Sequence, residues 1–177
     1  TLVSAADVAA GRWRFNPDVG ASLGLSAADG QSFLRHYTQR LAEDEKYNLT
    51  VWPYHAMLGG IGHALVPTIE EAIFFHSICR FARPDFQVKG DNPLTENYSV
   101  LRPEIMRGPA GENVGAKNLA FIQKLLAFDA LIIAGQAQSH CVAWTVDDLL
   151  AEIKSTDAEL ARRVYLLEDC TSPVVIP

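Results

Sequence analysis

One apolar segment and its neighbours restrict the fold class of this chain most strongly. Residues 130–134 (Ala-Leu-Ile-Ile-Ala) contain no polar side chain, which is typical of a strand covered on both faces. A turn over 135–140 and a helix over 141–153 follow, and the apolar residues of 163–167 predict another strand. Because two parallel strands need a long crossover connection, this strand–helix–strand order indicates a parallel sheet.

The part of the chain before residue 130 also alternates between predicted strands and predicted helices. Short β-rich segments predict strands over 48–52 and 86–89, and apolar residues at helical spacing predict helices over 68–82 and 114–127. We therefore predict an α/β fold, with three α/β/α layers and a doubly wound, mainly parallel, Rossmann-like sheet.

The first part of the chain is less regular. Residues 1–32 show no sustained period, and we expect an irregular segment with short helical turns. An amphipathic helix is predicted over 33–44 with Ser32 as its N-cap, and Thr68 is expected to open the helix over 68–82. All 177 residues are assigned to a single domain.

Composition narrows the classes of partner and the compartment. The formal net charge of −6 does not indicate a basic surface that would bind nucleic acid or an anionic membrane. We therefore expect small molecules as partners. No apolar stretch reaches the roughly 20 residues that span a bilayer. The three cysteines argue against a disulfide framework and for a reducing, cytoplasmic location.

Both ends of the sequence look interrupted. The chain begins at Thr1 without an initiator methionine, and residues 170–177 follow a predicted strand without a closing helix. We expect a domain that lacks its first strand and its C-terminal end.

Reactive side chains follow three of the predicted strands. His55 comes just after residues 48–52, Lys89 ends the segment 86–89, and Cys141 lies in the turn after 130–134. Ligands of open α/β sheets bind beyond the carboxyl ends of the strands. These three residues are therefore the first candidates for a functional site.

Cys141 is the candidate nucleophile. At the start of a predicted helix, unpaired N–H groups and the helix dipole favour a thiolate. The alternative is a small buried hydrophobic side chain, which is how we interpret Cys79 and Cys170. A lysine at position 89 is suited to stabilise a thiolate and to help orient a reacting carboxylate, the alternative being an ordinary surface lysine at a strand end.

The five histidines are less informative. His36 and His76 fall on predicted helices and are interpreted as structural. For His63 and His140, the sequence does not decide between a structural and a functional role. His140 precedes Cys141 directly, and neighbouring side chains usually diverge, so we do not expect the two to form a catalytic dyad. The sequence contains no complete metal-binding or phosphate-binding motif.

Three motifs together resemble a known family. Residues 52–55 (Trp-Pro-Tyr-His), 88–90 (Val-Lys-Gly) and 134–142 (Ala-Gly-Gln-Ala-Gln-Ser-His-Cys-Val) occur in the order and spacing of the isochorismatase-like cysteine hydrolases, over about residues 50–172. The stretch 95–99 (Thr-Glu-Asn-Tyr-Ser) resembles the longer nicotinamidase-related amidases of that family.

The resemblance implies roles for individual residues. It implies Cys141 as nucleophile, Lys89 as its catalytic partner, and an oxyanion hole made by the backbone N–H groups of Ala137 and Cys141. It also implies a cis peptide bond between Gln136 and Ala137. The Asp motif that ends the family's first strand has no counterpart in this sequence.

The resemblance also implies a substrate site. His55 and Tyr98 are its candidate substrate-binding residues, and His55 is in addition a candidate metal ligand. The aspartate–histidine pair that completes the nicotinamidase metal site is absent here, and Ala56 replaces the cysteine usual after the histidine. No cofactor is expected to be required, and a divalent metal is left open.

We therefore hypothesise that the protein is an amidohydrolase. It cleaves the C–N bond of a small amide, such as a nicotinamide-like carboxamide, through a thioester intermediate, and we expect a homo-oligomer. One alternative is a non-catalytic binding or scaffold member of the same fold. Another is vinyl-ether hydrolysis of isochorismate, which the retained Cys141 disfavours because that reaction does not need it.

Overall fold

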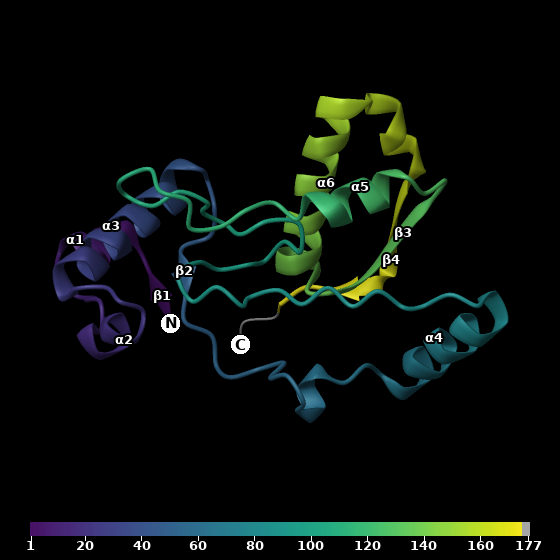
Figure 1. Ribbon diagram of the computed structural model, residues 1–177, viewed down its shortest axis with the longest axis horizontal. Helices are drawn as coiled ribbons and strands as arrows, with labels where there is room; N and C mark the ends of the chain where they lie inside the picture. The colour runs from purple at the N-terminus through teal and green to yellow at the C-terminus, as the bar shows by residue number, and fades with distance from the viewer. Residues whose placement is uncertain (175–177) are drawn as a thin grey trace. The chain divides into compact units, whose positions relative to one another are not determined.

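The computed structural model describes residues 1–174 (Figure 1). The chain divides into two compact units. Unit 1 consists of Thr1–Leu2 and Thr50–Gln87, and unit 2 consists of Val3–Leu49 and the chain from Val88 onward. Among the described residues, no helix combines the length and the apolar character needed to cross a membrane.

Unit 2 begins with three helices. α1 (Ala5–Ala9) and α2 (Pro17–Ser22) are short, as predicted for residues 1–32, and α3 (Ala27–Glu43) has 17 residues. The predicted N-cap at Ser32 is wrong, because the hydroxyl of Ser26 accepts the N–H of Asp29 and opens α3 there. A serine followed three residues later by an acidic residue is a strong helix start.

The predicted strand over 48–52 is reduced to a short pairing. β2 (Leu49–Thr50) has two residues and pairs with β1 (Leu2–Val3). The strand predicted over 86–89 is wrong, since that segment has no regular structure. Phe86 and Val88 are more than 70% exposed. A β-rich segment becomes a strand only where another backbone satisfies its hydrogen bonds.

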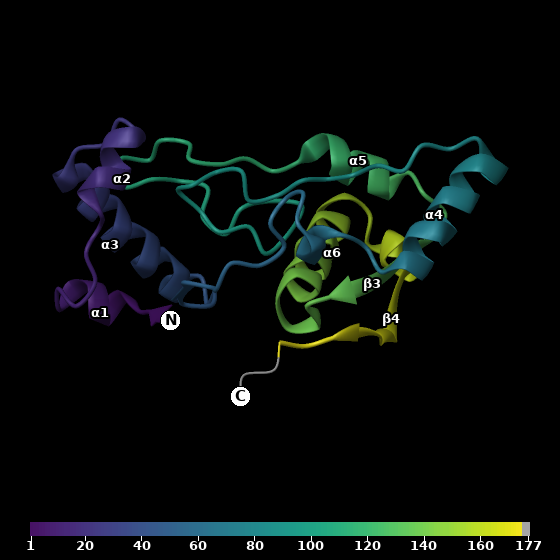
Figure 2. The same cartoon turned by 90° about the horizontal axis from the view of Figure 1, so that it is seen from below.

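The strand–helix–strand unit is confirmed. β3 (Leu131–Gln136) leads through a turn into α6 (Ala143–Thr156), the short 3₁₀-helix η3 (Ala158–Arg163) follows, and β4 (Val164–Ser172) closes the unit. β3 and β4 pair in parallel, with an irregularity in register between Ile133 and Gly135. Figure 2 shows the two strands from below. The larger doubly wound sheet stays a prediction.

The main core of unit 2 lies between this sheet and two helices. α5 (Leu119–Leu126) is shorter than the predicted helix over 114–127, and Asn118 caps it. The buried side chains come from the loop before α5, from α5 itself and from α6: Leu101, Ile122, Leu149 and Ile153. Leu131, Ile133 and Val164 of the sheet pack against them. Ile132 points the other way and is 67% exposed, so the expectation that this strand is covered on both faces is not met in the described chain.

A second core lies beneath α3. Its buried members are Phe33, Tyr37, Leu41 and Ile105. The first three follow the helical spacing that predicted an amphipathic helix, and Ile105 comes from the proline-containing loop before α5. The same loop, which includes residues 96–104, contributes Leu101 to the main core and Ile105 to the second core.

Unit 1 contains the 3₁₀-helix η1 (Ile61–His63) and the helix α4 (Pro67–Arg80). The helix predicted over 68–82 is confirmed, but Thr68 does not open it. Pro67 occupies the first turn and Val66 is the N-cap, without a side-chain cap. Cys79 of α4 is exposed, as is Cys170 of β4, so the prediction that both lie in the core is wrong.

Candidate active site

The structure brings Lys89 and Cys141 into contact. The Lys89 Nζ lies 3.4 Å from the Cys141 Sγ, across 52 positions of sequence. The same ammonium donates a hydrogen bond of 2.6 Å to the backbone carbonyl of Asn97. Lys89 therefore reaches the thiol although the strand predicted for it does not form.

Cys141 lies in a turn between β3 and α6. The predicted helix over 141–153 begins at Ala143, and Gln138–Val142 instead form a single π-helical turn, η2. The carbonyl of Ala137 accepts the N–H groups of His140, at 3.0 Å, and Val142, at 3.1 Å. Single π-turns are uncommon and occur often at functional sites.

The predicted oxyanion donors bracket this turn. The peptide bond between Gln136 and Ala137 is cis, as the resemblance implied. Ala137 begins the turn and Cys141 lies near its end, and both are half-buried. Their role as donors to an oxyanion stays a prediction.

His140 lies within a cluster of aromatic rings. Its ring centroid is 4.6 Å from that of Tyr47 and 5.3 Å from that of Tyr98, and its Nδ1 lies 2.9 Å from the hydroxyl of Ser139. Burial lowers the pKa of His140, which favours the neutral imidazole at neutral pH. Trp144 completes the cluster through an edge contact with Tyr47.

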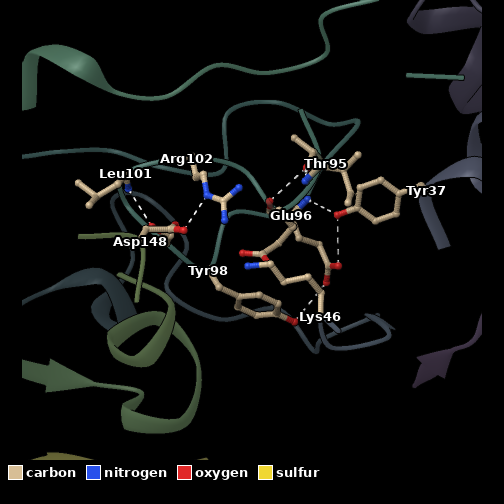
Figure 3. Close-up of polar contacts among 11 residues, drawn as sticks. Tyr37, Lys46, Thr95, Glu96, Tyr98, Leu101, Arg102 and Asp148 are labelled. Atoms are coloured by element: carbon tan, nitrogen blue, oxygen red, sulfur yellow. Dashed lines mark hydrogen bonds and ion pairs between the residues drawn. The ribbon is translucent and has the colours of Figure 1, made fainter. Parts of the chain in front are cut away.

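Tyr98, a predicted substrate-binding residue, is buried beside this cluster. Its hydroxyl donates to the carboxylate of Glu96 at 3.2 Å. Figure 3 shows the carboxylate of Glu96 also facing the hydroxyl of Tyr37, 3.4 Å away. Burial and the neighbouring Glu96 raise the pKa of Tyr37, which keeps its phenol protonated. A role of Tyr98 in binding substrate stays a prediction.

Sequence reasoning missed a group of buried charges next to the site. The ammonium of Lys46 lies 3.2 Å from Glu104, with the two side chains 7% and 2% exposed. Arg102 forms an ion pair of 2.6 Å with the buried Asp148, as Figure 3 shows. Burial raises the pKa of Glu104, and the charge of Lys46 opposes that rise. No periodic pattern in the sequence marks these residues as buried.

A cavity of about 200 Å³ lies in unit 2, apart from the Cys141 turn. Its walls are mainly apolar, and Tyr37, Thr95 and Glu96 provide its polar groups. Cys141 and Lys89 do not line it.

His55 belongs to unit 1. Its Nδ1 lies 2.7 Å from the carbonyl of Pro53, and its ring makes an edge contact with Trp52. Within residues 1–174, no group of three or more histidine, cysteine or acidic side chains is arranged to hold a metal ion. The roles of His55 in binding substrate or metal stay predictions.

Comparisons with protein-family models, with curated proteins and with solved structures find no match for this chain.

Proposed function

We propose that this protein is a cysteine hydrolase that cleaves the C–N bond of a small carboxamide, with Cys141 as nucleophile. The observation that supports this most is the 3.4 Å contact between Lys89 and Cys141. The motif resemblance implies a catalytic role for both residues. A lysine and a thiol brought together from distant segments form an arrangement suited to nucleophilic catalysis.

Lys89 is suited to keep the sulfur ionised. A cation beside a thiol favours the thiolate, which is the nucleophilic form. Because the ammonium also donates to the carbonyl of Asn97, it is held at the sulfur by a backbone group. An ammonium group has three N–H donors. Two of them bond to the Asn97 carbonyl and the Cys141 sulfur, and the third can donate to a substrate oxygen.

The proposed reaction proceeds through a thioester. The sulfur of Cys141 forms a bond to the amide carbon, and N–H groups at Ala137 and Cys141 receive the oxyanion. The C–N bond then breaks with its electrons on nitrogen, which takes up a proton from the solvent and leaves as ammonia. Water adds to the thioester carbon and the C–S bond breaks, which releases the carboxylic acid, the thiolate and one proton that returns to the solvent.

The test measures ammonia release by the full chain from a panel of small aromatic and aliphatic carboxamides. Replacing Cys141→Ala is expected to lower the rate by about 10³-fold or more, since it removes the nucleophile. The matched control is Cys79→Ala, which removes an exposed thiol of unit 1 and leaves the rate unchanged. Mass spectrometry of a quenched reaction is expected to find the acyl group on Cys141.

A second test uses the variant Lys89→Met and measures the alkylation of Cys141. This variant is expected to slow the alkylation of Cys141 near pH 6, because the thiolate loses its neighbouring cation, whereas Lys154→Met at the end of α6 has no effect. Equal ammonia release by the Cys141→Ala variant and the unaltered chain contradicts the proposed function. So does a Cys141 that reacts with iodoacetamide only after unfolding.

A further inference from the structure

We propose that Tyr47 is a positioning residue, which holds the turn bearing Cys141 in the geometry that places the thiol at Lys89. This inference rests on the proposed function for its catalytic consequence, but the positioning itself is a property of the thiol. Tyr47 follows helix α3 and is 92 positions from the residue it binds.

Tyr47 contacts the turn through both its hydroxyl and its ring. The hydroxyl donates a hydrogen bond of 2.7 Å to the carbonyl of Ser139, and the ring lies 4.6 Å from that of His140 at an angle of 32°. These are the two residues directly before Cys141. The Ser139 hydroxyl also accepts the N–H of Val174, so this part of the turn is bound from two distant segments.

The residue before Tyr47 supplies the anchor. Lys46 extends into the interior, where its ammonium pairs with Glu104 and lies 3.5 Å from the centre of the Trp144 ring. Trp144 belongs to the first turn of α6, directly beyond the π-turn. Lys46 and Tyr47 therefore hold opposite ends of the segment that contains Cys141.

Movement of this turn changes the contact between Lys89 and the thiol. The Nζ–Sγ distance of 3.4 Å lies within hydrogen-bond range of a sulfur atom, and charge stabilisation weakens as the two atoms separate. Because Ser139 and His140 directly precede Cys141, their positions determine the position of the Cys141 backbone. Losing the contacts of Tyr47 therefore lowers the fraction of molecules with the thiol beside Lys89.

The experiment measures the rate of Cys141 alkylation by iodoacetamide between about pH 5 and pH 9. The full chain carries Cys79→Ser and Cys170→Ser, so that one thiol is followed. Tyr47→Phe removes the hydroxyl but keeps the ring, and is expected to slow alkylation near pH 6 about two- to tenfold. Tyr47→Leu removes both contacts and is expected to slow it more, with the midpoint of the pH profile moved upward.

Controls separate positioning from general stability. Tyr165→Phe and Tyr165→Leu make the same changes on β4, in a half-exposed side chain, and are expected to leave the profile in place. Urea denaturation gives the stability of every variant. A Tyr47→Leu variant that is less stable but has an unchanged alkylation profile overturns the proposal. Where Tyr47→Leu does not fold, an unchanged profile in Tyr47→Phe overturns it.

Ammonia release is measured on the same variants. If no carboxamide is hydrolysed by the unaltered chain but the Tyr47 variants move the alkylation midpoint, the proposed function is wrong and the positioning role of Tyr47 stands. If carboxamides are hydrolysed through Cys141 and the Tyr47 variants match the unaltered chain in rate and midpoint, the proposed function stands and the positioning role is wrong.

Discussion

The helices α4 of unit 1 and α6 of unit 2 have the same length but opposite surroundings. Each contains 14 residues with apolar side chains at helical spacing. In α6, Ile153 is fully buried, whereas Ile78 of α4 is 53% exposed. The structure describes all of unit 1, and no side chain there is buried.

The difference shows how little an apolar pattern says about packing. A helical period indicates that a segment can form a helix with an apolar side, but burial needs a second element at the right distance. In unit 2, the elements that pack against α6 are α5, β3 and the loop containing Leu101. The candidate site of unit 2 is built on this packed frame, and the buried charges around Glu104 are part of it.

The largest expected effect concerns the buried ion pair. Lys46→Met leaves the carboxylate of Glu104 buried without its cation, and the free energy of unfolding near pH 7 is expected to fall by about 3–5 kcal/mol. The comparison is Glu71→Gln on the exposed surface of α4, with an expected change within about 0.5 kcal/mol. Urea denaturation followed by circular dichroism measures both.

The cost of Lys46→Met is expected to depend on pH. Burial raises the pKa of Glu104 and Lys46 opposes that rise, so without Lys46 the folded state holds the proton to still higher pH. In that range the folded state binds more protons than the unfolded state, and the free energy of unfolding falls as pH rises. The deficit should therefore shrink near pH 4.5, and Lys46→Met with Glu104→Gln should recover stability at pH 7. A deficit independent of pH contradicts this account.

The packing contrast can be tested directly in the two helices. Ile153→Ala is expected to lower the free energy of unfolding by about 2–5 kcal/mol, because it leaves a cavity in the core of unit 2. The same change at Ile78, which is half-exposed on α4, is expected to cost less than about 1 kcal/mol. Similar losses at both positions show that α4 is packed as tightly as α6, and the contrast is then wrong.

The smallest expected effect concerns helix starts. Ser26→Ala removes the hydroxyl that accepts the N–H of Asp29 and is expected to cost about 1 kcal/mol. Val66→Ala at the start of α4 removes no side-chain cap and is expected to be close to neutral. Thermal unfolding compares the two variants, and an equal loss at both sites contradicts the assignment of the Ser26 cap.

Much of the local structure was predictable. The strand–helix–strand unit, α4 and the position of Cys141 between a strand and a helix follow from apolar periodicity and turn residues, with errors of a few residues at the ends. The motifs also picked out Lys89 as the partner of Cys141, although the strand expected beneath it does not form. A β-rich segment such as 86–89 is ambiguous, because strand formation depends on a neighbour elsewhere in the chain.

The sequence by itself determined which segments become helices, that two strands around α6 pair in parallel, and which thiol follows a strand end. Only the tertiary structure decided that Lys89 reaches that thiol, that Lys46 is buried against Glu104, and that Tyr47 binds the turn before Cys141. The physical reason is the range of the interactions. Periodicity reports contacts between residues three or four apart, whereas these contacts join residues 52 to 92 positions apart, and burial of their polar groups depends on the assembled core.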